Sequence, residues 1–181
     1  MAIAKMGVDL VGPLPIVPRN LYFTTIALEY FTKWIKAKAL AKIASSTLSS
    51  FVWQRIIRRF GVPSYITIDN AKQFNYMECI NFCSELGIKL AFASVNQPES
   101  NRAVKRANNL IFNAVSKALF DLPKGKWTQE LITSVWGHNI SCTRTIGFTP
   151  FCLLYGEEAI MLEELKLGSF DTEIAATTPI Q

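Results

Sequence analysis

The chain has 181 residues, 50% of them hydrophobic, which is enough to bury the core of one domain. Its net charge of +5 favours a polyanionic partner such as nucleic acid. No apolar run approaches the ~18 residues that a membrane span needs, which excludes a membrane partner. The start of the chain lacks the basic and apolar stretches of a secretory signal, so we expect an intracellular, reduced protein.

The first part of the chain predicts strands followed by a helix. Residues 8–11 form an apolar run that stops at Gly12-Pro13. We expect the runs over 21–30 and 34–40 to form a hairpin beside it. Ser45-Ser46-Thr47 offers an N-cap for a helix that extends to about residue 60. Its apolar positions share one face: Leu48, Phe51, Val52 and Ile56.

The second part of the chain alternates strands with helices. Residues 65–68 are a short β-branched run that predicts a buried strand. A helix over 76–86 leads through Gly87 into a strand over 88–93. Further helices are expected over 101–120, 128–142 and 151–155. This order of elements predicts a mixed sheet with helices on both faces.

Two acids lie in or directly after these apolar strands. Asp69 ends the strand over 65–68, and Asp9 lies inside the strand over 8–11. Carboxylates at strand ends are where α/β folds usually carry out their chemistry. About half of lone acids in this position instead cap the next helix, so Asp69 alone does not decide between a site and a cap.

Two other groups have both a functional and a structural interpretation. Cys79 and Cys83 lie one helical turn apart and could share a metal with His138, the only histidine. His138 lies on another expected helix, so core thiols are the better interpretation. A group of arginines lies off the apolar face of the helix over 45–60, and is more often a solvated surface than a DNA site: Arg55, Arg58 and Arg59.

Several stretches, in the right order, resemble the catalytic core of a retroviral-type integrase, of the kind encoded by gypsy-type long-terminal-repeat retrotransposons of plants. Three of them carry most of the resemblance: Gly7-Val8-Asp9-Leu10-Val11-Gly12-Pro13, Asp69-Asn70-Ala71-Lys72-Gln73-Phe74, and the loop and helix start over 96–109. The resemblance extends from about Val8 to Leu165 and includes further motifs: Tyr30-Phe31-Thr32-Lys33-Trp34, Phe60-Gly61-Val62-Pro63 and Gly147-Phe148-Thr149-Pro150-Phe151.

The resemblance implies an α/β protein with the ribonuclease-H-like fold. This fold has a five-stranded mixed sheet, an antiparallel second strand, and helices on both faces. We expect one integrase core-like domain over residues 1–165. The pattern is lost from about residue 166, so residues 166–181 are expected to form a C-terminal tail.

The resemblance also implies a catalytic site of three acids that binds Mg²⁺ or Mn²⁺. Asp9 and Asp69 match the first two acids and are the expected metal ligands. The family's Glu follows the second Asp with thirty-five residues between, and this position is Lys105 here. A protonated lysine has no lone pair and cannot ligate a metal, so metal binding is expected to be weak or lost.

Two arrangements of Lys105 remain open. Its ammonium could lie between Asp9 and Asp69 and relieve their repulsion, or it could point into solvent and leave the acids unpaired. Glu29 is not expected to replace the missing acid, because its place in the second strand matches a non-catalytic position of the family.

Other departures from the family are consistent with a degenerate copy. Ala71 stands where the family has Gly, and Arg102-Ala103 stands where it has Gly-Gln. Basic side chains now gather near the start of the helix over 101–120, where a helix favours anions. We expect this cluster either to bind DNA phosphates or to be merely unfavourable: Arg102, Lys105 and Arg106. Lys72 is a further residue expected to bind DNA.

We therefore expect an integrase core-like domain that is catalytically inactive and binds DNA without sequence preference. The alternative is a non-catalytic module, retained from an integrase, that binds nucleic acid or dimerises. A third interpretation is a relic with no function. The family's N-terminal and C-terminal domains are not in the sequence, which predicts a fragment of a polyprotein gene. An integrase would act in the nucleus.

Overall fold

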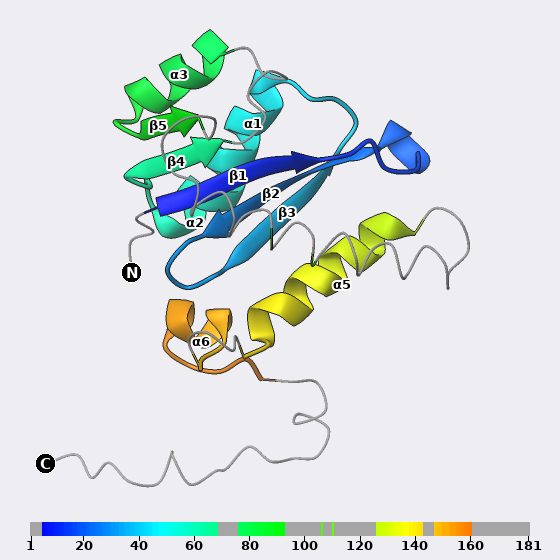
Figure 1. The fold of residues 1–181 in the computed structure, drawn as a ribbon, viewed down its shortest axis with the longest axis vertical. Helices are drawn as coiled ribbons and strands as arrows, with labels where there is room; N and C mark the ends of the chain where they lie inside the picture. The colour runs from blue at the N-terminus through cyan, green and yellow to red at the C-terminus, as the bar shows by residue number, and fades with distance from the viewer. Residues whose placement is uncertain are drawn as a thin grey trace, which may run out of the picture.

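The computed structural model describes residues 5–68, 76–92, 106, 110, 126–142 and 147–160. A five-stranded sheet forms its centre, in the order β3-β2-β1-β4-β5 (Figure 1). The strands are β1 Lys5–Val11, β2 Phe23–Glu29, β3 Ile35–Leu40, β4 Tyr65–Ile68 and β5 Lys89–Phe92. β2 runs antiparallel to both of its neighbours, and β4 runs parallel to both of its own. The predicted mixed sheet with an antiparallel second strand is confirmed.

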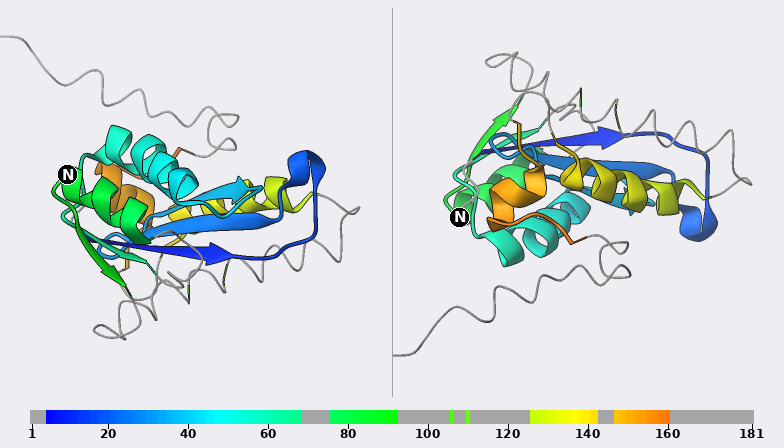
Figure 2. Two further views of the ribbon diagram at one scale, coloured as in Figure 1. Left: turned by 90° about the horizontal axis from the view of Figure 1, so that it is seen from above. Right: turned by 90° about the horizontal axis from the view of Figure 1, so that it is seen from below.

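Helices cover both faces of this sheet, as expected (Figure 2). One helical stretch is continuous from α1 Ser45–Val52 through a π-helical turn, η2 Trp53–Ile57, into α2 Arg58–Phe60. It packs with α3 Tyr76–Glu85 on one face. The opposite face is covered by α5 Trp127–Ile140, which is followed by α6 Pro150–Tyr155. The short 3₁₀ turn η1 Pro18–Asn20 lies between β1 and β2.

Successive side chains of β1 contribute to two hydrophobic cores, one on each face of the sheet. Met6 and Val8 are buried, and together with Leu10 they contact the core under α1 and α3. Val11 belongs to the opposite core, under α5. Successive side chains of a strand point to opposite faces, so Asp9, one residue past Val8, stands on the α5 face.

Gly12 ends β1 for a steric reason. Its φ of 146° is one that residues with a side chain rarely adopt. A Cβ at this position would lie 2.4 Å from the Phe23 ring and 2.9 Å from the Tyr22 carbonyl oxygen. Only glycine fits where the chain turns out of the sheet, in agreement with the predicted end of the first strand.

The expected N-cap at Ser45-Ser46-Thr47 is wrong. The capping residue is Ala44, whose carbonyl accepts from the backbone amides of Thr47 and Leu48. Ser45 is already helical and is buried. Its hydroxyl bonds the thiol of Cys79 on α3, so a contact between helices replaces the local cap.

The other expected elements that can be compared agree to within two residues, except that β1 starts three residues before the expected strand over 8–11. The expected strand over 88–93 is β5, Lys89–Phe92, and the expected helix over 128–142 is α5. Of the expected helix over 101–120, the described residues are Arg106 and Leu110, and both are helical. The tail over 166–181 lies outside the described residues, so the boundary at 165 stays a prediction.

Asn139 holds α5 against the edge of the sheet. Its side-chain Oδ1 accepts from the Ile35 amide at 2.9 Å, and its Nδ2 donates to the Ile35 carbonyl at 3.0 Å. β3 is an edge strand, so the buried side-chain amide of Asn139 takes the place of a neighbouring strand at this residue. Trp127, at the other end of α5, donates from Nε1 to the Pro15 carbonyl at 2.8 Å.

We predict that Asn139→Asp lowers the free energy of unfolding by about 1–3 kcal/mol, the usual cost of an unmet buried polar group. The carboxylate still accepts from the Ile35 amide but no longer donates to its carbonyl, and the two oxygens repel. Urea denaturation measures the change. Gln129→Glu is the matched control, because it makes the same chemical change at an exposed position of α5. Equal loss in both variants would contradict this role of Asn139.

Candidate functional site

Asp9 lies on β1, the central strand of the sheet. It pairs with Ile26 of β2, and its side chain is only 7% exposed. Its Oδ1 accepts from the Leu10 amide at 2.8 Å, and its own carbonyl accepts from the Thr25 hydroxyl at 3.4 Å. β1 therefore fixes this carboxylate in a buried position on the α5 face.

The parallel pairing of β1 with β4 brings the two expected acids into one region of the backbone. The last pair in the register is Val8 opposite Ile68. The next residue of each strand in sequence is Asp9 in β1 and Asp69 after β4. Asp69 itself lies outside the described residues, so the distance between the two carboxyl groups stays a prediction.

Of the other residues of the predicted site, the structure describes only Arg106. Arg106 is helical and exposed, as a phosphate-binding side chain needs to be. The other expected site residues lie outside the described residues: Lys72, Arg102 and Lys105. The structure therefore tests neither the salt bridge expected between Lys105 and the two acids nor the cluster around it.

The oxygen donors near Asp9 suit a hard divalent cation. Thr67 pairs with Gly7, so its side chain stands on the same face as Asp9, two residues before Asp69. Its hydroxyl is buried and has no hydrogen-bond partner among the described residues. Carboxylate and hydroxyl oxygens are the ligand types that Mg²⁺ and Mn²⁺ prefer. Within the described ranges no three His, Cys, Asp or Glu side chains gather.

The carboxylate of Glu29 has a structural role in the turn between β2 and β3. It is 3% exposed, and its carboxylate accepts from the Phe31 amide at 3.1 Å. It also accepts from the Thr32 amide and the Thr32 hydroxyl, each at 2.6 Å. Glu29 pairs with Met6, three residues from Asp9 along β1, or roughly 10 Å. These contacts give Glu29 a role in the β2–β3 turn that the sequence did not indicate, and that Glu29 is not catalytic stays a prediction.

Cys79 and Cys83 are core thiols, as predicted. Both are buried between α1 and α3, and burial raises the pKa of Cys83 to about 11, so the thiol stays protonated. His138 lies on α5, over the other face of the sheet, and its Nε2 bonds the Lys33 carbonyl at 2.9 Å. Burial lowers the pKa of His138, which favours the neutral ring. The three side chains cannot share a metal.

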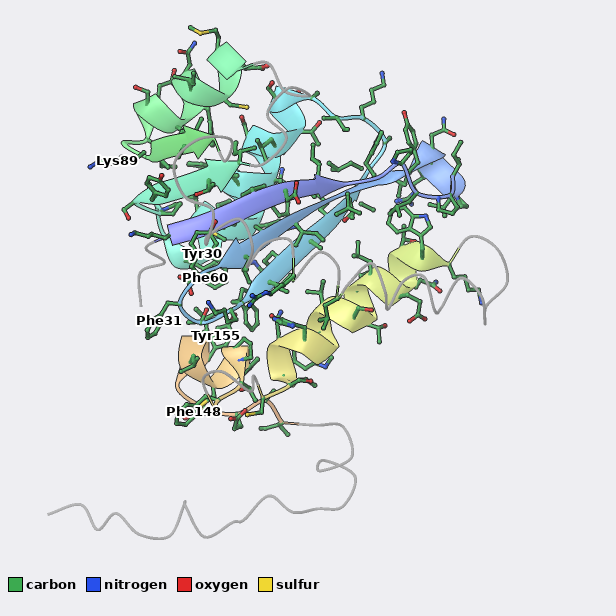
Figure 3. All side chains as sticks on the ribbon, viewed as in Figure 1. Tyr30, Phe31, Phe60, Lys89, Phe148 and Tyr155 are labelled. Atoms are coloured by element: carbon green, nitrogen blue, oxygen red, sulfur yellow. The ribbon has the colours of Figure 1, made fainter. Side chains whose placement is uncertain are left out.

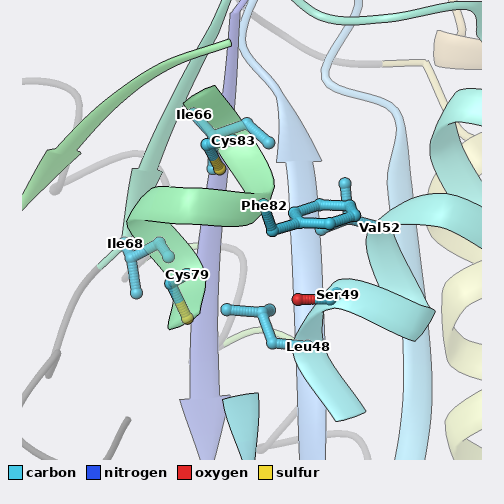
Figure 4. Close-up of a pocket in the computed structure, with 8 residues that line it drawn as sticks. All are labelled: Leu48, Ser49, Val52, Ile66, Ile68, Cys79, Phe82 and Cys83. Carbon is cyan, nitrogen blue, oxygen red and sulfur yellow. The ribbon is translucent and has the colours of Figure 1, made fainter. Parts of the chain in front are cut away.

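The small space between α1 and α3 is a packing gap (Figure 4). It is lined mainly by apolar side chains and thiols, with Ser49 as the one hydroxyl among the lining residues, and has a volume of about 10 Å³. That is room for one water molecule at most, and such a site offers a water almost no polar partners. It is therefore no candidate for a ligand site.

The arginines on the helical stretch over 45–60 have a charged neighbour, Lys36 of β3, that the sequence did not predict. Arg55, Arg58 and Arg59 are all exposed, as expected of a solvated surface. Lys36 of β3 has a pKa below its usual value, because of burial first and then the charges of Arg59 and Arg55. The arginines of the helix and a lysine of the edge strand thus form one cationic surface.

Comparison with known proteins relates this architecture to retroviral Pol proteins. The chain is 23% identical over 141 residues to the Gag-Pol polyprotein of woolly monkey sarcoma virus, covering 78% of this chain and 8% of that protein. It is 27% identical over 153 residues to the Pro-Pol polyprotein of simian foamy virus type 3, covering 84% and 13%. It thus spans only a small part of the curated relatives it matches. No family model matches the chain.

Solved structures give the decisive comparison. The chain is similar to the catalytic core domain of BIV integrase, with a TM-score of 0.65 and 16% identity over 84% of this chain and 93% of that one. It is also similar to the HTLV-2 integrase catalytic core domain in complex with magnesium, with a TM-score of 0.63 and 21% identity, covering 83% and 95%. The fold is that of an integrase catalytic core.

A third solved structure has the same fold within a larger chain. It is a simian T-cell lymphotropic virus intasome in complex with PP2A regulatory subunit B56 gamma, with a TM-score of 0.72 and 20% identity, covering 89% of this chain and 57% of that one. The expected ribonuclease-H-like fold class is confirmed, because integrase catalytic cores have this fold. The described part of the chain contains no helix long and apolar enough to cross a membrane.

We predict that Glu29→Gln lowers the free energy of unfolding by about 1–3 kcal/mol, because an amide cannot replace both acceptor oxygens of the carboxylate in a buried turn. Thermal or urea denaturation measures the loss. Glu78→Gln makes the same change at an exposed position of α3 and should cost under about 0.5 kcal/mol. If Glu29→Gln is as mild as this control, the turn does not depend on the carboxylate.

Proposed function

We propose that this chain is the core-like domain of an integrase from a gypsy-type, plant-like retrotransposon, and that it is a degenerate copy that binds DNA without joining strands. The observation that carries the proposal is the integrase-core fold with Asp9 buried on β1, beside the strand that leads into Asp69. The gypsy-type assignment is supported by the ordered sequence motifs around these two acids.

Covalent geometry supports a shared site for the two acids. Consecutive Cα atoms lie ~3.8 Å apart, so Asp69 is one such step from Ile68. Ile68 pairs with Val8, which is one step from Asp9, and neighbouring strands lie about 4.8 Å apart. In this proposal Asp9 and Asp69 would hold Mg²⁺ or Mn²⁺. When bound, such metals activate the attacking oxygen and stabilise the leaving one in phosphoryl transfer.

Lys105 is the reason to propose inactivity. The family's three carboxylates give the site a net charge of −3, whereas two carboxylates and one ammonium give it a net charge of −1. The ammonium also supplies donors where the site needs an acceptor. Within this proposal Asp9 and Asp69 bind a divalent cation weakly, and Lys105 stabilises the pair of acids in place of the metal.

A non-catalytic module is the alternative function. The same fold could bind nucleic acid or pair with a second copy without any metal, and Lys105 favours this alternative over present activity. HTLV-2 integrase core has been solved in a trimeric form, and an intasome is among the similar structures, so a homo-oligomer is part of this alternative. If the chain is functional, we propose that it acts in the nucleus.

We predict weak DNA binding that depends on Lys72, Arg102, Lys105 and Arg106. Replacing both Arg102 and Arg106 with Ala should weaken binding to duplex DNA of any sequence. It should also reduce the slope of log affinity against log salt by about two, since each phosphate contact contributes about 0.9. Fluorescence anisotropy over a salt series measures both quantities.

The matched control removes two other exposed cations, Arg58 and Lys89, by replacement with Ala. Lys89 points away from the sheet at the start of β5 (Figure 3). Equal effects of the two double variants would mean that binding follows net charge and that the cluster has no special role.

We predict that the natural chain does not join DNA strands and that Lys105→Glu restores metal binding before activity. The new carboxylate returns the site from one negative charge to three and supplies a ligand. Mn²⁺ should then raise the melting temperature, by the equivalent of about 2.7 kcal/mol at a hundred times the dissociation constant. Activity should lag, because Ala71 and Arg102 still differ from the family and errors of ~1 Å in positioning can cost 100-fold.

Two controls separate the outcomes. Lys105→Glu combined with Asp69→Asn should lose the response to Mn²⁺ again. Strand transfer by the natural chain that Asp69→Asn abolishes would show that the third acid lies elsewhere. Absence of any Mn²⁺ response in Lys105→Glu would show that more of the site than Lys105 has changed.

A further inference from the structure

The outer edge of β3 has backbone groups for which the described residues supply no partner. Glu29 donates from its amide to the Trp34 carbonyl at 2.9 Å, which makes these two residues a hydrogen-bonded pair of the β2–β3 ladder. Antiparallel pairs alternate, so the N–H and C=O groups of Ile35, Ala37 and Ala39 point away from β2. Asn139 occupies those of Ile35. The groups that remain for another strand belong to Ala37 and Ala39.

A groove of about 370 Å³ follows this edge and has two different walls. One wall comes from α5 and is largely apolar: Thr128, Leu131, Ile132 and Val135. Ile132 is 72% exposed, which leaves a large apolar side chain uncovered. The other wall is cationic: Lys36, Lys38 and Arg55. Between them Ala37 and Ala39 have small side chains on the α5 side, which leaves space for larger partners.

An anionic partner would complement the cationic wall. The described charges that act on Lys36 are those of Arg59 and Arg55, and no carboxylate is among them. The Lys36 ammonium also lies 5.0 Å from the centre of the Trp34 ring, which holds it at the edge of the sheet. Clustered like charges repel, and carboxylates beside them would relieve that repulsion.

In a strand added at this edge, two kinds of side chain must alternate, one for each wall of the groove. Side chains opposite Ala37 and Ala39 would face the apolar wall, and those opposite Lys36 and Lys38 would face the cations. Such a strand needs apolar or β-branched residues alternating with acids, in either chain direction. Residues 170–174 have this pattern: Phe170, Thr172 and Ile174 alternate with Asp171 and Glu173.

We propose that residues 170–174 of this same chain add to β3 as a further strand, with Asp171 and Glu173 against the cationic wall and Phe170 and Ile174 against α5. Residues 161–181 lie outside the described residues, so the proposal stands on the groove, the free edge and the sequence pattern. It is independent of the proposed integrase-like function.

The chain is long enough to reach the groove. Tyr155 of α6 packs edge-on against Trp34 at 5.6 Å between ring centres, so α6 lies near the start of β3 (Figure 3). The described chain ends at Ile160, and the nine residues over 161–169 can span about 30 Å when extended. The six residues of β3 extend for only about 20 Å.

The test is amide hydrogen exchange of the full chain, followed residue by residue by NMR. In the natural chain the amides of Ala37 and Ala39 should exchange at least about tenfold more slowly than in Asp171→Lys/Glu173→Lys, where the tail is repelled by the cations. The Ile35 amide is the internal reference, because its partner is Asn139 and its rate should not change. Glu163→Lys/Glu164→Lys is the matched control with the same change in charge.

A charge exchange makes the test specific. Adding Lys38→Glu and Arg55→Glu to the Asp171→Lys/Glu173→Lys variant should restore slow exchange at Ala37 and Ala39. Equal rates in the natural chain and in Asp171→Lys/Glu173→Lys overturn the proposal. Slow exchange that appears only as protein concentration rises also overturns it, because the strand would then come from a second copy. Slow exchange that requires added duplex DNA overturns it in favour of a nucleic-acid groove.

Discussion

The parallel pairing of β1 with β4 is the constraint on which the rest of the structure depends. β1 is hydrogen-bonded on both sides, antiparallel to β2 and parallel to β4, so it fixes the direction of the whole sheet. A parallel neighbour cannot be reached by a tight turn, and the helices α1 and α2 lie in the connection that precedes β4. The same pairing decides which residues of the two strands lie side by side, and hence where Asp9 stands relative to the end of β4.

Three acidic residues of the described chain differ in the hydrogen-bond donors that surround them. Asp9 is buried in mid-strand on the face that α5 covers, and its Oδ1 accepts from the Leu10 amide. Glu29 is equally buried but is surrounded by donors from its own turn, which makes it a structural acid. Glu158 accepts from the Thr149 hydroxyl near the start of α6. Each of these acids is thus held by a different local structure: a strand, a turn and the start of a helix.

The sequence predicted the strands and helices well, because alternation and apolar periodicity are local properties. It failed where a distant contact decides. The Ser45 hydroxyl bonds Cys79 and leaves the N-cap to Ala44, and nothing near Ser45 reveals that partner. The pairing of Asn139 with Ile35 joins residues 104 apart, and no local pattern in α5 indicates it. Of the candidate site, Asp9 on a buried strand was predictable, whereas the side-chain positions of Asp69 and Lys105 lie outside the described residues.

The pairing of Asn139 with Ile35 also bears on how the chain folds during synthesis. β3 emerges from the ribosome about a hundred residues before Asn139 does, so its outer edge is unprotected for much of translation. An open strand edge is a template for pairing with other chains. Lys36 and Lys38, which lie on this strand, supply charge that discourages such pairing until α5 arrives. Contacts between residues so far apart in sequence also form slowly, so the docking of α5 is expected to be a late step of folding.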